Sequence, residues 1–331
     1  MIYRTIRIET EREYRLVKDL LQAEGLRFEE GVDYTVGILD QEELIATGSL
    51  QDNVLKMIAV RSDYRGENLT ATVILDLMHE LHKRGIDKYF LFTEPDGVRF
   101  FTDYSFSVVA ETAAIALLEN RIDTIEERLT RMAKEIEAKK ESRAAIVMNC
   151  NPVTLGHLYL IERAAKENDD VIIFLVEEDR SVFPFEARYS LLKSVTSEIG
   201  NVTVLPSTEY IISNLTFPTY FLKRITDQSR IHMELDLTIF KKHFMPIFRI
   251  DYRYVGVEPL DPSTALYNET MKETLGASLR VIDRLTIDGS VVSASRVRRL
   301  ARKKRFDEIK RIVPKATYDY LISEEGIELF R

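Results

Sequence analysis

Two segments that lie far apart in the sequence contain residue types that bind phosphate groups. The first, residues 149–157, reads NCNPVTLGH and directly follows the apolar stretch 144–148. Thr154 offers a hydroxyl donor, and Gly156 has no Cβ to keep a phosphate away from the backbone. His157 can donate to phosphate oxygens and, when protonated, can neutralise charge on a leaving pyrophosphate.

The position of this segment between a predicted strand and a predicted helix favours the phosphate interpretation. A helix amino terminus presents unpaired N–H groups and a partial positive charge, which together attract an anion. In a purely structural interpretation, Thr154 caps the helix and the His157 side chain is merely solvated. Because the strand–loop–helix context of a T-x-G-H motif is present, we predict a phosphate-binding loop.

The second segment, residues 292–298, reads VSASRVR and lies between the last predicted strand and another predicted helix. Ser293 or Ser295 can cap that helix, which is the structural interpretation. In the functional interpretation, both hydroxyls and the Arg298 guanidinium bind the β- and γ-phosphates of a nucleotide, because a planar fork of donors suits two oxygens at once. Since both segments belong to the same predicted sheet, we expect them to form one site.

The elements that must position these segments follow an alternating pattern. Predicted strands alternate with predicted helices from about residue 143 onward, at residues 144–148, 171–176, 202–205, 253–257 and 281–282. Such alternation is typical of a doubly wound parallel sheet of the Rossmann-like type, whose ligands lie beyond the carboxyl ends of the strands.

The N-terminal part has a mixed pattern that indicates an α+β module. Predicted strands at residues 34–39, 44–50 and 54–60 follow one another, and a helix with Leu69, Val73, Leu77 and Leu81 at i+4 spacing precedes another strand at 89–93. Apolar residues between 122 and 136 predict one amphipathic helix. We therefore predict domains at residues 1–120 and 143–331 with a helical linker at 121–142. The linker helix is expected to pack between the domains. A dimerisation arm is the less favoured alternative, because the apolar pattern covers only two heptads.

The composition excludes several classes of protein. The 331 residues include 46 Lys+Arg and 54 Asp+Glu, so the net charge of −8 gives no reason to expect a nucleic-acid partner. One cysteine, Cys150, excludes a disulfide framework and a cysteine-rich metal site. The early charges at the N-terminus do not resemble a secretory signal, and no apolar run is long enough to span a membrane. We expect a cytoplasmic protein without a membrane partner.

The two phosphate segments resemble the T/H-x-G-H and I-S-S-T-x-x-R signatures of the nucleotidyltransferase superfamily. Further segments are similar to the citrate (pro-3S)-lyase ligases, also called citrate lyase synthetases, and the likeness extends over most of the chain. These segments are residues 183–188 (FPFEAR), 209–221 (EYIISNLTFPTYF) and 254–259 (YVGVEP), followed by Thr264, Tyr267, Asn268 and Met271. The domain order is also that of the family, with an acetyltransferase-like module first and an HxGH-type adenylating module second.

This resemblance implies an AMP-forming ligase that uses ATP and Mg²⁺ to activate acetate as acetyl-AMP. The acetyl group then passes to the thiol of the CoA-like prosthetic group on the acyl carrier (gamma) subunit of citrate lyase, which activates that enzyme. By the motifs, Thr154, His157 and Arg298 are the catalytic residues. The resemblance assigns the nucleotide to Asn149, Asn151, Gly156, Arg188, Ser293 and Ser295. Arg188 has two interpretations, a contact with the triphosphate or an ion pair with Glu186 or another carboxylate.

The turn at residues 60–70 resembles the pyrophosphate-binding turn of GNAT acetyltransferases, R/Q-x-x-G-x-G/A. Arg65 matches, whereas Asn68 and Thr70 replace the inner glycine and the small residue after it. We therefore expect the module to position the CoA-like group, with Arg65 and Gly66 as its contacts, rather than to catalyse acetyl transfer from acetyl-CoA. No metal-binding cluster is predicted, because His79 and His82 have no third ligand.

Two other features allow more than one interpretation. Cys150 is expected to be a small apolar filler, with an acyl-cysteine relay as the minor alternative. A dense basic patch is either a solvated helix face or a landing site for phosphates and an acidic carrier domain; it comprises Arg296, Arg298, Arg299, Arg302, Lys303, Lys304 and Arg305.

The alternative enzyme is an adenylyltransferase of cofactor biosynthesis, of the pantetheine-phosphate or nicotinamide-nucleotide type, although that reaction needs neither the first module nor the segment at 210–221. A class I aminoacyl-tRNA synthetase is disfavoured because no K-M-S-K-S segment is present. A metabolite-binding regulator is disfavoured by the intact phosphate motifs.

Overall fold

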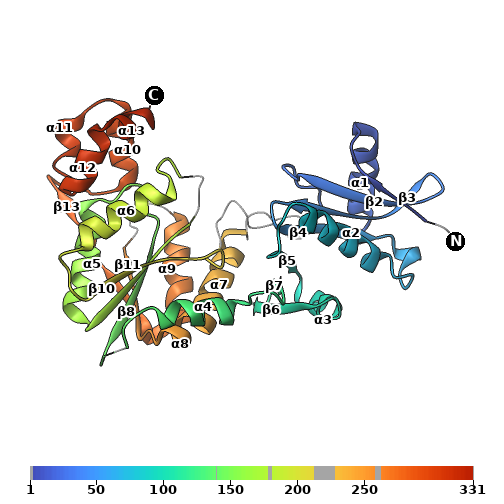
Figure 1. The fold of residues 1–331 in the computed structure, drawn as a ribbon, viewed down its shortest axis with the longest axis horizontal. Helices are drawn as coiled ribbons and strands as arrows, with labels where there is room; N and C mark the ends of the chain where they lie inside the picture. Colours follow the sequence, from blue (N-terminus) through green and yellow to red (C-terminus); the bar gives the residue numbers. More distant parts are fainter. Residues whose placement is uncertain (1–2, 139, 178–180, 212–227, 258–261, 331) are drawn as a thin grey trace. The chain divides into compact units, whose positions relative to one another are not determined.

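The computed structural model describes residues 3–138, 140–177, 181–211, 228–257 and 262–330. The chain divides into two compact units (Figure 1). Unit 1 contains the described residues of 1–128 and 214–238, and unit 2 those of 129–213 and 239–331. Two of the segments that resemble the ligase family lie partly outside the described residues. They lack residues 212–221 of the segment 209–221 and residues 258 and 259 of the segment 254–259.

Unit 1 is built on a seven-stranded sheet in the order β1-β2-β3-β4-β5-β7-β6. All neighbouring strands are antiparallel except β4 and β5, which pair in parallel at Val54–Phe90 and Leu55–Leu91. The strands are β1 (Arg4–Arg7), β2 (Tyr34–Asp40), β3 (Glu43–Gln51), β4 (Val54–Val60), β5 (Phe90–Thr93), β6 (Phe106–Glu111) and β7 (Ala116–Asn120). The predicted GNAT-like α+β module is confirmed.

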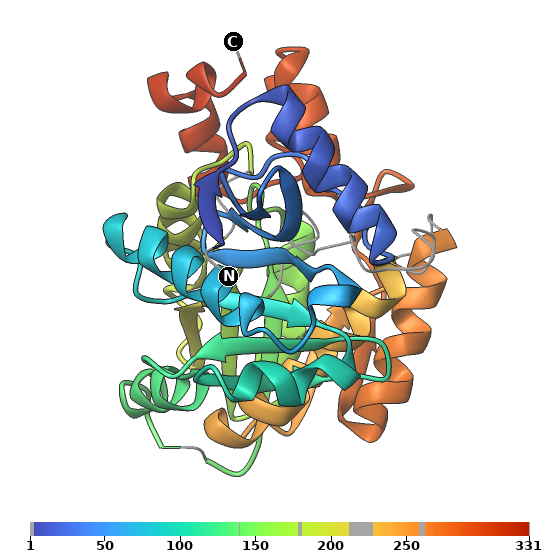
Figure 2. The ribbon, with the colours of Figure 1, turned by 90° about the vertical axis from the view of Figure 1, so that its right-hand side faces the viewer.

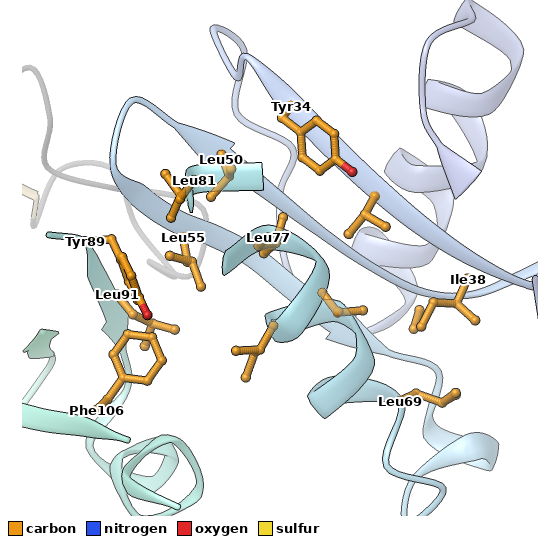
Figure 3. Packing of buried hydrophobic residues seen from close by; sticks show 14 of the residues in the cluster. Tyr34, Ile38, Leu50, Leu55, Leu69, Leu77, Leu81, Tyr89, Leu91 and Phe106 are labelled. Carbon is orange, nitrogen blue, oxygen red and sulfur yellow. The ribbon is translucent and has the colours of Figure 1, made fainter. Parts of the chain in front are cut away.

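Two helices pack on this sheet, α1 (Glu11–Ala23) and α2 (Leu69–Lys83), and they lie on opposite faces of it (Figures 1 and 2). The i+4 spacing of apolar residues on α2 brings Leu69, Leu77 and Leu81 into one buried cluster with sheet residues such as Ile38 and Leu55 (Figure 3). Burial of each such side chain stabilises the unit by about 1.5–3 kcal/mol. A short helix, α3 (Val98–Thr102), precedes β6.

The apolar spacing between residues 122 and 136 corresponds to helix α4 (Ile125–Lys134). Ile125 and Leu129 on this helix are buried. The domain limits 1–120 and 143–331 stay a prediction. The division into units falls within α4, and unit 1 also includes the range 214–238.

Unit 2 contains a five-stranded parallel sheet in the order β10-β9-β8-β11-β12. The strands are β8 (Arg143–Met148), β9 (Asp170–Leu175), β10 (Val202–Pro206), β11 (Tyr252–Gly256) and β12 (Leu279–Ile282). The chain adds β9 and β10 on one side of β8 and β11 and β12 on the other, so the strand order reverses between β8 and β11. This confirms the predicted doubly wound sheet and places its crevice beside β8.

The helices of unit 2 occupy the connections between these strands and the C-terminal part. Unit 2 contains the helices α5 (Leu155–Glu167), α6 (Phe185–Thr196), α8 (Met245–Phe248), α9 (Pro262–Leu275), α10 (Ala294–Arg302), α11 (Phe306–Ile309), α12 (Lys315–Ile322) and α13 (Glu324–Glu328). Helices α10 to α13 gather at one end of the unit (Figure 1). Helix α7 (Gln228–Ile239) belongs to unit 1 except for its last residue, and a π-helical turn at Phe240–Phe244 connects it to α8. Two short strands, β13 (Thr286–Ile287) and β14 (Ser290–Val291), form a hairpin before α10.

Candidate nucleotide-binding site

The amino terminus of α5 is closed by a capping box that fixes the His157 ring. The backbone N–H of Thr154 donates to Nδ1 of His157 over 3.0 Å, and the Thr154 Oγ1 accepts from the backbone N–H of His157 over 3.4 Å. Because Nδ1 accepts a hydrogen bond from the backbone N–H, the neutral ring carries its own hydrogen on Nε2. His157 can therefore cap the helix and bind a ligand at the same time. Nδ1 accepts the capping hydrogen bond, and Nε2–H remains as a donor.

A pocket of about 460 Å³ lies over this helix start, a size common for small-molecule sites. It brings together most of the residues assigned from the two phosphate segments, namely Asn149, Thr154, Gly156, His157, Ser293, Ser295 and Arg298. Residues at the carboxyl ends of β8, β11 and β12 complete the lining, among them Met148, Gly256 and Ile282. The pocket thus lies where the strand order reverses, which is where α/β sheets bind their ligands.

Gly156 has a packing role that the sequence interpretation did not include. A Cβ at this position would lie 3.0 Å from the backbone carbonyl oxygen of Val292, a distance that side chains rarely tolerate. The missing side chain therefore lets the start of α5 pack directly against the residue before Ser293. Gly156 joins the two phosphate segments to each other as well as leaving the backbone accessible.

The second segment forms the start of α10. Ser293 is the N-cap, with its Oγ accepting from the backbone N–H of Arg296 over 3.3 Å, and it also lies 3.1 Å from the Oγ of Ser295. Arg298, one turn further on, donates from its guanidinium to the backbone carbonyl of Asn151. Burial and the neighbouring Arg302 lower the pKa of Arg298, which indicates a cation with reduced access to water.

Arg188 and Asn151 lie behind the pocket lining rather than in it. The Arg188 side chain is completely buried, and its guanidinium donates to the carbonyl oxygens of Phe183, Asn149 and Val176 and to the side-chain oxygen of Asn149. The side-chain oxygen of Asn151 accepts from the backbone N–H of Phe183 over 3.1 Å. These contacts hold the loop after β8 in place and present Asn149 to the pocket.

The surroundings of His157 favour its neutral form over the charged imidazolium. Burial and the positive charge of Arg284 lower the pKa of His157 to about 4. The ring is therefore neutral at pH 7, and its contribution is a directed Nε2–H donor rather than a formal charge. Neutralisation of a leaving pyrophosphate by a protonated His157 stays a prediction.

Arg284 and Arg253 line the same pocket and were missed by the sequence interpretation. Arg253 is a buried residue of β11 whose guanidinium lies over the Phe240 ring, 4.4 Å from its centroid. Arg284 follows β12 by two residues and is half-buried, and burial lowers its pKa. The available signal was their place at or just beyond the carboxyl ends of predicted strands, where the residues of such sites gather.

Cys150 is buried beneath this loop, and burial raises the pKa of its thiol well above the usual range. A thiol that keeps its proton is a poor nucleophile, so the acyl-cysteine relay is not supported.

In unit 1, the turn that resembles a pyrophosphate-binding turn already holds a carboxylate. Oε1 of Glu24 accepts from the backbone N–H of Ser62 over 2.8 Å, and its Oε2 forms an ion pair with Arg65. Gly66 adopts a φ of 92° and Asn68 a φ of 57°, so both are in the left-handed region. The contact of Arg65 and Gly66 with a CoA-like group stays a prediction, and Glu24 competes with it.

Among the described residues, no group of three or more His, Cys, Asp or Glu side chains is arranged to hold a metal ion. None of the described helices combines the length and apolar character needed to cross a membrane.

Comparisons with known proteins relate this architecture to a family. Residues 143–321 match the family described as "Citrate lyase ligase C-terminal domain". The chain is 35% identical to the citrate (pro-3S)-lyase ligase of Klebsiella pneumoniae over 85% of its length and 84% of that protein. It is 33% identical to that of Escherichia coli K12, over 92% of this chain and 89% of that protein.

Shorter and more distant likenesses also exist. A phosphopantetheine adenylyltransferase of Symbiobacterium thermophilum is 43% identical over 56 residues, which is 16% of this chain and 35% of that enzyme. Among solved structures, an acyl-CoA N-acyltransferase from Pseudomonas aeruginosa is 14% identical with a TM-score of 0.32, covering 36% of this chain and 99% of that one.

Proposed function

The chain belongs to the citrate lyase ligase family, and from this premise we propose that it activates acetate with ATP and transfers the acetyl group to the carrier subunit of citrate lyase. The observation that carries the proposal is the meeting of residues 154–157 and 293–298 on one pocket at the point where the strand order reverses. That arrangement suits the triphosphate of a nucleotide, since two helix amino termini and an arginine face one cavity.

In the first step, a carboxylate oxygen of acetate forms a bond to the α-phosphorus of ATP, and the bond from that phosphorus to the bridging oxygen breaks. Pyrophosphate leaves with the electron pair, and acetyl-AMP remains. Because a carboxylate approaching a polyanion is repelled, the site must supply positive charge and hydrogen-bond donors rather than a strong base. Nε2–H of His157, the Thr154 hydroxyl and the N–H groups of α5 face the reacting region, whereas Ser293, Ser295 and Arg298 hold the departing phosphates.

The residues present fit a Mg²⁺ ion that is held by the nucleotide rather than by a protein cage. Asp283 is the one carboxylate in the described pocket lining. The other side-chain oxygens there belong to Asn149, to Thr154, Ser293 and Ser295, and to the two tyrosines. Magnesium commonly keeps several waters and binds substrate phosphates with one or two carboxylates. When held beside Asp283, it would neutralise part of the charge of the phosphates.

In the second step, the thiol of the CoA-like prosthetic group attacks the acetyl carbonyl carbon. A thioester forms, the thiol proton is released, and AMP leaves. The acyl carrier (gamma) subunit of citrate lyase is the proposed partner, and its acetylation activates the lyase. The alternative, an adenylyltransferase of cofactor biosynthesis, is not favoured, since its likeness to this chain covers a small share of the sequence.

Acetate-dependent exchange of radiolabelled pyrophosphate into ATP tests the proposal. We expect exchange only when acetate is present, and release of AMP only when the deacetylated carrier subunit is added. Exchange that depends instead on phosphopantetheine or nicotinamide mononucleotide would support the alternative. If ATP binds but exchange is absent with every acid, with phosphopantetheine and with nicotinamide mononucleotide, both enzymatic functions are contradicted.

A further inference from the structure

A second arginine, Arg284, lines the pocket outside both phosphate segments. Arg284 follows β12, and its Cγ lies 3.9 Å from the position that a Cβ on Gly256 would occupy. The side chain of Arg284 therefore crosses the carboxyl end of β11, which neighbours β8 at the reversal of strand order. Arg298 is anchored differently, on α10, by its bond to the carbonyl of Asn151.

His157 shares the described part of the pocket lining with six other ionisable side chains, which are Asp283, Arg253, Arg284, Arg298, Tyr159 and Tyr254. Arg284 lies beside Gly256 at the carboxyl end of β11, and Gly256 lines the same pocket. After burial, the positive charge of Arg284 is the second cause of the low pKa of His157, which agrees with their shared place in the lining.

We propose that Arg284 binds the α-phosphate beside Nε2–H of His157 and stabilises the charge that develops there when the acid attacks. The inference rests on the proposed function and assigns to that site a substrate-contacting residue outside both phosphate motifs. If Ser293, Ser295 and Arg298 hold the β- and γ-phosphates, the α-phosphate is left for Arg284 and His157, which line the same pocket.

Arg284 and His157 would each meet one requirement of the reaction, a permanent positive charge and a directed hydrogen-bond donor. A guanidinium keeps its charge at every working pH, so Arg284 supplies the permanent positive charge. Burial and, to a smaller extent, the same charge keep His157 neutral, which leaves Nε2–H as a donor whose state does not change near pH 7. A solitary histidine with an ordinary pKa would be a mixture of two forms under the same conditions.

The test compares Arg284→Gln, which removes the charge, with Arg284→Lys, which keeps the charge but loses the planar fork. Arg280→Gln is the matched control, because Arg280 lies on β12, four residues before Arg284, but its guanidinium stacks on the Tyr252 ring, 3.9 Å from its centroid, and is not in the pocket lining. Each full-length variant is measured for acetate-dependent pyrophosphate exchange, for binding of inorganic pyrophosphate by calorimetry, and for titration of His157 by NMR, with its signal assigned by comparison with His157→Asn.

We expect Arg284→Gln to lower the exchange rate by about a hundred- to a thousand-fold, with pyrophosphate affinity changed less than threefold. Its His157 pKa should rise from about 4 toward the ordinary value, whereas Arg284→Lys and Arg280→Gln should keep it low. If Arg284→Gln does not fold, Arg284→Lys carries the test, with a smaller fall in exchange at unchanged His157 pKa.

Exchange within threefold of the wild type in Arg284→Gln, or a loss of pyrophosphate affinity equal to the loss of exchange, would overturn the inference. An unchanged His157 pKa in Arg284→Gln would also overturn it. Failure of the proposed function is distinguishable, because it is read as absence of exchange in the wild type. The His157 titration needs no acid and still decides whether the two side chains face each other.

Discussion

The two ring nitrogens of His157 have separate tasks. Nδ1 is occupied by the backbone N–H of Thr154, and only Nε2–H can reach a ligand. A substitution can therefore remove one function and keep the other. Asparagine places an amide oxygen near the position of Nδ1, whereas glutamine places an amide N–H near the position of Nε2.

We predict that His157→Asn lowers the acetate-dependent exchange rate by about two to three orders of magnitude, since the donor to the transition state is lost. ATP affinity should change much less, because the donor contributes mainly in the transition state. His157→Gln keeps a donor and should retain more activity than His157→Asn. Equal rates in both variants, measured by exchange at saturating acetate, would show that Nε2–H is not used.

The low pKa of His157 predicts how stability depends on pH. The pKa is about 4 in the folded chain and 6.5 for an ordinary histidine. Between these values the unfolded chain binds the extra proton, so this site makes the fold less stable as the pH falls from about 6.5 to about 4. Each pKa unit corresponds to about 1.4 kcal/mol, so the loss is at most about 3 kcal/mol.

Differential scanning calorimetry at several pH values measures this effect. The Tm of the wild type should fall more steeply than that of His157→Asn between pH 7 and pH 4.5, because the variant has no group to titrate there. If Tm falls with pH at the same slope in both proteins, His157 does not have a lowered pKa in the folded chain. Activity should follow the same logic, with no midpoint near 6.5 in the pH profile of kcat/KM.

At the scale of elements, the packing of α5 against the segment before α10 depends on one missing side chain. A methyl group on Gly156 would meet the Val292 carbonyl oxygen at 3.0 Å, whereas a Cβ on Gly200 would have no atom within 4 Å. We predict that Gly156→Ala lowers the stability of unit 2 by about 1–3 kcal/mol through overpacking. It should also weaken ATP binding, since the two phosphate segments are pushed apart.

Gly200→Ala is the control for this substitution and should leave Tm and ATP affinity nearly unchanged. Calorimetric Tm and ATP titration measure both variants. If Gly156→Ala binds ATP like the wild type at an unaltered Tm, the close packing of these elements is not required.

Helix α10 carries the nucleotide contacts at its start and exposed positive charge at its end. Arg302, Lys303 and Lys304 are exposed in a chain whose net charge is −8. We predict that reversing these three residues to Glu slows acetyl transfer to the carrier subunit several-fold and reduces its dependence on salt, because an acidic carrier would lose its electrostatic attraction. Acetate-dependent exchange should remain nearly normal.

The matched control reverses three exposed cations on other helices, Arg12 on α1, Lys83 on α2 and Lys166 on α5, for the same change of net charge. Transfer rates measured at low and high salt separate a local docking surface from a general charge effect. Equal loss in both triple variants, or equal loss in exchange and transfer, would argue against docking at α10.

At the scale of the whole molecule, the sequence predicted the fold class of both parts and the two segments that meet in the pocket. Apolar strands followed by helices identify a parallel sheet, and the order of such a sheet brings its carboxyl ends together. Arg284 was missed because no motif contains it, and its place just beyond a predicted strand was the only signal available. Likewise, nothing in the residue type of Arg188 indicates that its donors serve buried carbonyl groups rather than a ligand.

Unit 1 poses the remaining question, because its turn resembles a pyrophosphate site and yet binds a carboxylate of its own chain. The Glu24 carboxylate takes the backbone N–H of Ser62 and the Arg65 guanidinium, which are the kinds of donor that an incoming pyrophosphate would need. A second anion at this turn would meet like charge and competition for its donors. We therefore predict no more than weak binding of acetyl-CoA, with a Kd in the millimolar range or above.

Glu24→Gln removes the negative charge and should strengthen binding of CoA by at least several-fold, because Arg65 then becomes available to the pyrophosphate. Glu11→Gln, an exposed position on the same helix, is the control and should bind like the wild type. Calorimetric titration of the three proteins with CoA and acetyl-CoA measures the effect. Tight binding by the wild type, with turnover on an amine, would mean that unit 1 is an active acetyltransferase, and equal binding by wild type and Glu24→Gln would mean that the turn is not where the CoA-like group docks.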